Sequence, residues 1–121
     1  MANWYTRPVL FVGDVERSLR FYVGELGFAE RWRHAEGAKV LVAQADREGC
    51  EIIFSCQWPE KAGNGMLFIS LSHEAFADLP DRLTQAGVVF REGSWGYRCI
   101  IVADPDGNEL YFPAPDDKGG T

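Results

Sequence analysis

An internal repeat constrains the fold of this chain more than any other feature. Ala45–Phe54 aligns without gaps to Ala103–Phe112, and half of the paired positions are identical. Both segments have the composition of a tight turn that leads into a strand. Upstream, Glu25–Phe28 resembles Gln85–Val88, where a helix would end on a glycine and a strand would begin. Because both similarities recur after about 58 to 60 residues, the chain is predicted to contain two homologous halves.

The first half has the pattern of a strand, a helix and three further strands. Asp14 is a suitable N-cap, and the apolar side chains that follow it have helical spacing: Val15, Leu19, Tyr22 and Leu26. The predicted strands are Arg7–Val12 and segments near residues 28–34, 38–44 and 50–56.

The second half repeats this order. Its predicted strands are Met66–Leu71 and segments near residues 88–92, 97–103 and 109–113. The helix between the first two strands carries Phe76, Leu79, Leu83 and Ala86 at helical spacing. Because proline is favoured in the first turn of a helix, Pro80 is expected to mark where this helix begins.

The two halves together predict an α+β fold of two βαβββ modules within one domain. Module 1 is expected at about residues 5–58, module 2 at about 65–114 and a tail at 115–121, with the join near Pro59–Gly65. One helix can cover only one face of a sheet. We therefore expect helices on the outside and a curled mixed sheet that encloses a cleft.

Strand alternation predicts which side chains the open face carries. If the apolar positions face the helices, eight residues face the cleft: Arg7, Phe11, Glu51, Met66, Phe68, Ser70, Glu109 and Tyr111. This set is mostly apolar and aromatic with a few charges, as is usual for small-molecule sites. Alternatively, the two glutamates lie at strand ends in water.

The charge and the absence of certain motifs exclude several classes of function. Eighteen acidic residues against 12 basic ones give a net charge of -6, which disfavours nucleic acid as a partner. The N-terminus lacks an apolar signal core, and no apolar run has the length of a membrane span. Three cysteines without a CxxC motif suggest buried thiols in a reduced, cytoplasmic protein.

Arg7–Phe28 and Asp104–Phe112 together resemble the vicinal oxygen chelate superfamily. That group contains glyoxalase I, extradiol dioxygenases, fosfomycin-resistance enzymes and bleomycin-resistance proteins. The resemblance covers nearly the whole chain. It implies paired βαβββ modules, usually in a homodimer whose clefts form between modules.

The resemblance also implies where a divalent metal would be bound by His and Glu side chains. Here the corresponding positions hold Arg7, Met66 or Phe68, and Tyr111. A guanidinium cannot ligate a metal, and His34 and His73 fall on none of these positions. We therefore expect no metal, no other cofactor and no catalytic residue.

Ser94–Asp104 is similar to the Trp-Gly segment of bleomycin-resistance proteins, which sequester a drug without altering it. This implies that Trp95 stacks on a flat ligand, with Tyr97 as a second wall. Arg7 either pairs with Glu51 or Glu109, or favours an anionic or carbonyl-bearing ligand.

The leading hypothesis is a cytoplasmic, homodimeric protein that binds a planar or cationic small molecule, such as a bleomycin-like antibiotic. The predicted ligand-binding residues are Arg7, Phe11, Glu51, Met66, Phe68, Trp95, Tyr97, Glu109 and Tyr111. The alternatives are a metal-dependent glyoxalase-like lyase or isomerase, an extradiol-type dioxygenase, and a module that senses or carries a ligand for a partner protein.

Overall fold

The computed structural model describes the backbone of residues 3–118 and the side chains of residues 3–115. The chain divides into two compact units, Met1–Gly63 and Asn64–Thr121, which we call module 1 and module 2. Among the described residues, no helix is both long enough and apolar enough to cross a membrane.

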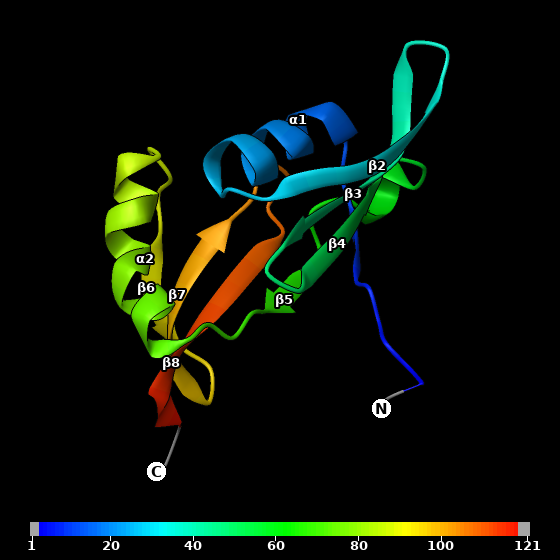
Figure 1. Cartoon of the computed structure of the whole chain (residues 1–121). Helices are drawn as coiled ribbons and strands as arrows, with labels where there is room; N and C mark the ends of the chain where they lie inside the picture. The colour runs from blue at the N-terminus through cyan, green and yellow to red at the C-terminus, as the bar shows by residue number, and fades with distance from the viewer. Residues whose placement is uncertain (1–2, 119–121) are drawn as a thin grey trace. The chain divides into compact units, whose positions relative to one another are not determined.

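Module 1 contains a four-stranded sheet, a helix that continues into a π-helical turn, and a short 3-10 helix (Figure 1). Its elements are β1 (Val9–Phe11), α1 (Val15–Leu19), a π-helical turn η1 (Arg20–Glu25), β2 (Ala29–Glu36), β3 (Lys39–Arg47), β4 (Cys50–Ser55) and a short 3-10 helix η2 (Pro59–Lys61). The strand order is β1-β4-β3-β2. The β1–β4 pair is parallel and the other two pairs are antiparallel.

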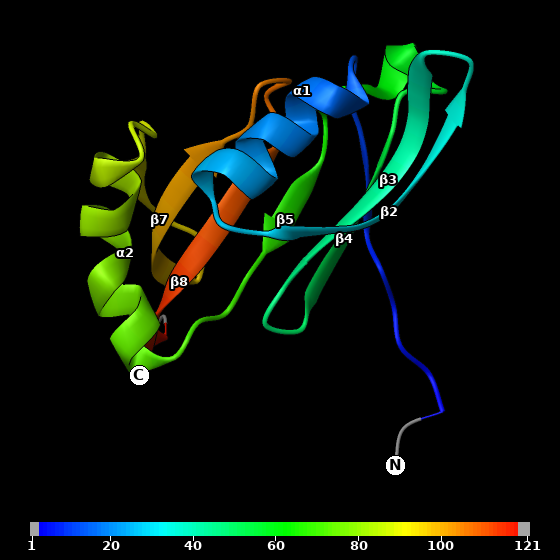
Figure 2. The ribbon, with the colours of Figure 1, turned by 45° about the horizontal axis from the view of Figure 1, so that its top comes forward.

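Module 2 has the same topology (Figure 2). Its elements are β5 (Met66–Phe68), α2 (His73–Gln85), β6 (Arg91–Ser94), β7 (Tyr97–Ala103) and β8 (Glu109–Lys118). The order is β5-β8-β7-β6, again with one parallel pair, β5–β8. The prediction of two βαβββ modules in an α+β fold is therefore confirmed.

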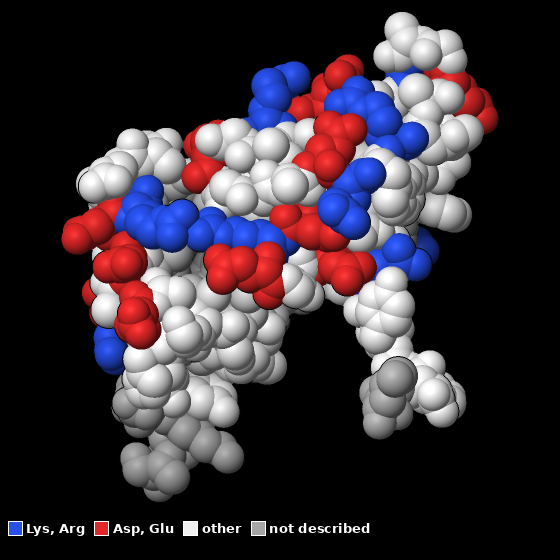
Figure 3. Space-filling view, in the orientation of Figure 1, with Lys and Arg blue, Asp and Glu red and all other residues white. Residues whose placement is uncertain are grey.

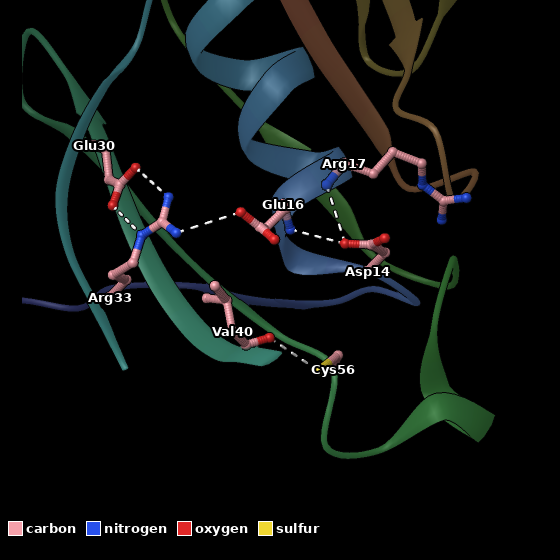
Figure 4. A network of polar contacts seen from close by, with 7 residues as sticks. All are labelled: Asp14, Glu16, Arg17, Glu30, Arg33, Val40 and Cys56. Carbon is pink, nitrogen blue, oxygen red and sulfur yellow. Dashed lines mark hydrogen bonds and ion pairs between the residues drawn. The ribbon is translucent and has the colours of Figure 1, made fainter. Parts of the chain in front are cut away.

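The first helix begins and packs as its sequence predicts. The Asp14 carboxylate accepts hydrogen bonds from the backbone N–H groups of Glu16 and Arg17, at 3.0 and 3.2 Å (Figure 4). All four side chains predicted for its apolar stripe are buried, and the Tyr22 ring lies 4.6 Å from that of Phe54 on β4. The π-helical turn that follows α1 was not predicted. It closes with a bond from Leu26 N to Phe21 O.

The predicted start of the second helix is wrong. α2 begins at His73, because the Ser72 hydroxyl caps it by accepting from Ala75 N at 3.1 Å, and Pro80 lies inside the helix. A proline there has no N–H to bond the carbonyl of Phe76. The helix nevertheless continues to Gln85. Its Leu83 side chain is buried, and α2 packs against β8.

The two repeated segments fold into different turns. Arg47 pairs with Cys50, so Glu48 and Gly49 form a two-residue hairpin loop with φ of 48° and 90°. In module 2, Ala103 pairs with Glu109, which leaves a five-residue loop, Asp104–Asn108. The pattern of local similarity therefore predicts both turns but not their lengths.

The predicted strand bounds differ from the observed ones mainly at three places. β5 ends at Phe68 rather than Leu71, and β6 begins at Arg91 rather than near residue 88. β8 continues to Lys118, so residues 115–118, which were expected to form a tail, belong to this strand. Residues 119–121 of the expected tail lie outside the described residues.

Candidate functional site

The face of the module 2 sheet that α2 leaves uncovered carries four of the predicted site residues. Phe68 pairs with Tyr111, and Met66 pairs with Glu109, across the parallel β5–β8 ladder. Residues paired in this way point to the same side of a sheet. Leu110, which lies between Glu109 and Tyr111, is fully buried on the opposite face.

Trp95 and Tyr97 extend this face into an aromatic patch, defined as Phe68, Trp95, Tyr97 and Tyr111. The centroid of the Phe68 ring lies 5.4 Å from that of Trp95 and 5.5 Å from that of Tyr97. Trp95 lies 6.2 Å from Tyr111. Both Trp95 and Tyr97 are at the β6–β7 connection, where Trp95 N donates to Tyr97 O at 2.9 Å.

The aromatic patch is open to solvent. Trp95 is 57% exposed and Phe68 39% exposed, and the neighbouring Met66 is 41% exposed. Large aromatic side chains gathered at an exposed face mark surfaces that bind other molecules more often than isolated ones do. A flat ring laid on this patch would contact several ring faces or edges at once.

Glu109 lies beside the aromatic patch and forms an ion pair within its own module. Its carboxylate accepts from the guanidinium of Arg91 at 2.8 Å, and both side chains are partly exposed. The pairing of Glu109 with Arg91 leaves the two charges next to the patch balanced. In the view of Figure 3, acidic and basic side chains are likewise interspersed over the surface.

The open face of the module 1 sheet is organised by a buried glutamine, Gln44, which is 4% exposed. Its Oε1 accepts from Arg7 at 2.8 Å and from the Trp32 indole N–H at 2.9 Å. Its Nε2 donates to Asp46 at 2.8 Å and to Glu51 at 3.1 Å. The predicted residues Arg7 and Glu51 are thus linked through Gln44, which the sequence analysis missed.

One signal in the sequence points to this network. Gln44 lies two residues from both Val42 and Asp46 in β3. Because side chains two residues apart point to the same side of a strand, all three lie on the open face. Trp32 lies directly opposite Gln44 in the β2–β3 register, but only after a bulge between Glu30 and Trp32. A bulge shifts every later side chain by one place, so the sequence alone could not align Trp32 with Gln44.

Phe11, the remaining predicted residue of module 1, contacts the segment that follows β4. Its ring packs edge-on against Trp58 with centroids 5.6 Å apart. The ammonium of Lys61 lies 5.1 Å from the Phe11 centroid and 5.7 Å from that of Trp58. Phe11 therefore belongs to an aromatic corner separate from the Gln44 network.

The residues at the metal positions implied by the resemblance do not suit a divalent cation. Arg7 is itself cationic and donates to Gln44, and Tyr111 lies in the aromatic patch. The nearby carboxylates of Glu51 and Glu109 are hydrogen-bonded to Gln44 and Arg91. Among the side chains of residues 3–115, no group of three or more His, Cys, Asp or Glu residues could hold a metal ion.

The cysteines are not placed as activated nucleophiles. Burial raises the pKa of the Cys99 thiol. The pKa of Cys50 is also raised, by burial first and then by the negative charges of Asp46 and Glu51. A higher pKa leaves less thiolate, which is the reactive form. Cys56 is buried and its sulfur lies 3.5 Å from the carbonyl of Val40 (Figure 4).

Comparison with solved structures finds the same fold in antibiotic-binding proteins and in resistance enzymes. TnmS3, an antibiotic binding protein from Streptomyces sp. CB03234, is 24% identical with a TM-score of 0.71, covering 93% of this chain and 97% of that one. The bleomycin-binding protein of Streptomyces verticillus, solved with copper(II)-bleomycin, is 24% identical with a TM-score of 0.73, covering 96% and 100%. The fosfomycin resistance protein FosX from Mesorhizobium loti is 14% identical with a TM-score of 0.65, covering 94% and 93%.

Among proteins with curated descriptions, none matches the chain. A family model, in contrast, matches residues 3–112, which include both modules. The matching model and the shared topology agree with the resemblance found in the sequence. The chain belongs to the Glyoxalase/Bleomycin resistance protein/Dioxygenase superfamily.

Proposed function

We propose that this protein binds a small molecule that contains a flat ring system and releases it chemically unchanged. The observation that carries this proposal is the aromatic patch of module 2, in which Trp95 and Phe68 remain exposed beside two tyrosines. We propose that the nine predicted residues form the binding surface of their own module: Arg7, Phe11 and Glu51 in module 1, and Met66, Phe68, Trp95, Tyr97, Glu109 and Tyr111 in module 2.

The physical basis for binding is the favourable contact of a flat ligand with aromatic rings. Each aromatic pair contributes about 0.5 to 1.5 kcal/mol beyond the area that it buries. A cationic group over a ring contributes about 0.5 to 2 kcal/mol. The patch offers several such contacts, and burying exposed indole and phenyl surface adds a further hydrophobic term.

The superfamily relatives support an antibiotic as the ligand. Two of the similar structures are named as an antibiotic binding protein and as a bleomycin-binding protein. At 24% identity this likeness concerns the fold, so the ligand class is our proposal. We further propose that the protein acts as a homodimer in the cytoplasm, where it sequesters the ligand.

A metal-dependent lyase, isomerase or dioxygenase is the alternative that the superfamily offers, and FosX represents its enzymes. The side chains at and near the implied metal positions favour ligand binding without a metal. Arg7 is a permanent cation, and Glu109 is paired with Arg91. Neither group is set up to receive a divalent cation.

Calorimetric titration with metal-free bleomycin and with copper(II)-bleomycin tests the proposal. We expect measurable binding, and the Trp95→Ala variant should bind about tenfold more weakly, a loss of about 1.4 kcal/mol. Trp4→Ala is the matched control, because Trp4 is 90% exposed and lies outside the proposed surface.

Unchanged affinity in Trp95→Ala would remove Trp95 from the site. If neither metal-free bleomycin nor copper(II)-bleomycin produced heat, bleomycin-like ligands would be rejected. Tightly held metal in stoichiometric amount, with turnover that a chelator abolishes, would overturn the binding function in favour of the enzyme. Sedimentation at the mass of a single chain would reject the homodimer.

A further inference from the structure

Gln44 is unusual because it is buried and all four of its hydrogen-bonding positions are used within one network of partly exposed side chains. A glutamine amide can accept two hydrogen bonds and donate two. Gln44 accepts from Arg7 and Trp32 and donates to Asp46 and Glu51. Such a fully satisfied buried group holds its partners in fixed positions.

The amide can take only one orientation. An indole and a guanidinium only donate, whereas ionised carboxylates only accept. Turning the amide over would set donors against donors and acceptors against acceptors at all four contacts. Gln44 therefore directs Arg7 and Trp32 to one end of the amide and the two carboxylates to the other.

The donor end of the network combines a cation with an aromatic ring. The Arg7 and Trp32 nitrogens share the same oxygen, at 2.8 and 2.9 Å, so the guanidinium and the indole lie side by side. Trp32 is 39% exposed, and Arg7 is exposed with the Tyr5 ring 5.5 Å away. Only one of the five guanidinium N–H groups is needed for Gln44.

The acceptor end of the network, which consists of the carboxylates of Asp46 and Glu51, has a positively charged partner of its own. Asp46 forms an ion pair with Arg31 at 3.1 Å in addition to its bond from Gln44. Asp46 and Glu51 pair directly across β3 and β4, so both carboxylates lie beyond the amide nitrogen. The orientation of one neutral amide thus places Arg7 at one end of Gln44 and the carboxylates of Asp46 and Glu51 at the other.

We infer that Gln44 is a positioning residue that presents Arg7 and Trp32 together as a subsite for a flat ring bearing a carboxylate or carbonyl group. The ring lies on the exposed indole, and the acidic or carbonyl oxygen accepts from the remaining guanidinium N–H groups. This inference rests on the proposed small-molecule function and assigns to module 1 a ligand chemistry that the aromatic patch of module 2 does not select.

Three probes with one ring system and different head groups test the ligand class: 2-naphthoate, 2-naphthamide and 2-naphthylmethylammonium. Their binding can be followed by NMR through the indole N–H signals of the four tryptophans, assigned with Trp→Phe variants. We expect 2-naphthoate and 2-naphthamide to shift the Trp32 signal and to bind about tenfold or more tightly than the ammonium probe.

Two variants test the positioning role. Gln44→Met keeps the length of the side chain but removes the acceptor, and Trp32→Phe keeps a flat ring but removes the N–H. Each is expected to weaken 2-naphthoate binding by about tenfold, whereas Trp4→Phe should leave it unchanged. Gln44→Met should also move the Trp32 indole signal without ligand, because its N–H loses its acceptor.

Trp32→Phe and Arg7→Lys decide the question if Gln44→Met does not fold, because both replaced side chains are exposed. The inference is overturned if 2-naphthoate fails to bind or shifts only the Trp95 signal, if the ammonium probe binds best, or if Trp32→Phe and Arg7→Lys bind 2-naphthoate like the unmodified protein. Bleomycin binding that depends on Trp95 would survive each of these outcomes, so failure of this inference can be distinguished from failure of the proposed function.

Discussion

Two buried amide side chains, Gln44 and Asn108, hold the polar contacts of their modules in place. Asn108 is fully buried, and its amide donates to the Asp104 carboxylate at 3.0 Å and accepts from Gly65 N at 2.7 Å. The Asp104 carboxylate also accepts from the backbone of Asp106 and Asn108 at 2.9 Å. Asn108 thus joins the loop before β8 to the residue that precedes β5.

Replacement of Asn108 by alanine is therefore expected to lower the free energy of unfolding by at least about 2 kcal/mol. The change leaves the partly buried Gly65 N–H and part of the buried Asp104 carboxylate without a partner. Each unsatisfied buried group costs about 1 to 3 kcal/mol. Denaturant unfolding measures the effect. Gln85→Ala, at an exposed position near the end of α2, is the control, and equal stabilities of the two variants would contradict this role.

The face and the contacts of a single side chain were only partly predictable from the sequence. The alternation of β1, β4 and β8 correctly gave the faces of Leu10, Ile52 and Leu110, because a strand has a fixed period of two. The partner of Glu109 was not predictable. It is Arg91, which lies 18 residues away in sequence and reaches Glu109 only because β7 lies between β6 and β8.

At the scale of secondary-structure elements, α2 shows a capping residue prevailing over a proline. Proline is common in the first turn of a helix. The helix nevertheless begins seven residues before Pro80, at His73. Thr84 donates its hydroxyl to the Pro80 carbonyl at 2.9 Å, so that carbonyl is engaged by a side chain of the next turn. An interior proline remains unfavourable for a helix even when packing tolerates it.

Pro80→Ala is accordingly expected to stabilise the protein, by about 1 to 3 kcal/mol, because alanine restores the backbone donor and has a higher helix propensity. Ser72→Ala should lower stability by about 1 kcal/mol through loss of the cap. Thermal and denaturant unfolding measure both changes. If the helix began at Pro80, neither substitution would have these effects.

The β3–β4 hairpin offers a second test at this scale. Glu48 is the one described non-glycine residue with positive φ, at 48°. Asparagine adopts this conformation more readily, and Asn-Gly is the favoured pair in such a two-residue loop. We expect Glu48→Asn to raise the free energy of unfolding by about 0.5 to 1 kcal/mol, and Gly49→Ala to lower it. Denaturant unfolding that ranks the two variants in the opposite order would reject this hairpin geometry.

At the scale of the whole molecule, the two modules share a topology but carry different chemistry on their open faces. Module 1 presents a row of Val9, Ile53, Gln44 and Trp32, whereas the corresponding row of module 2 is Phe68, Tyr111, Ile101 and Arg91. One face is built around a hydrogen-bonding amide and the other around aromatic rings. The same topology thus carries two chemically different open faces.

Ligand binding by the whole protein is expected to be independent of divalent metals. Dialysis against EDTA should leave the affinity for metal-free bleomycin unchanged, because the proposed contacts are rings and hydrogen bonds. Bound ligand at about 100 times its Kd should stabilise the protein by about 2.7 kcal/mol. Thermal unfolding before and after dialysis measures both effects, and a chelator-dependent loss of ligand-induced stabilisation would contradict the proposal.

The sequence by itself determined the repeated βαβββ order, the cap at Asp14 and the helix-facing side of β1, β4 and β8. These features depend on neighbours within a few residues, and the chain carries their signals locally. Only the tertiary structure decided that Gln44 joins Arg7 to Trp32 and Glu51, that Arg91 pairs with Glu109, and that the two repeated turns differ in length. Such contacts depend on strand register, which a single bulge or loop residue shifts without altering the local pattern.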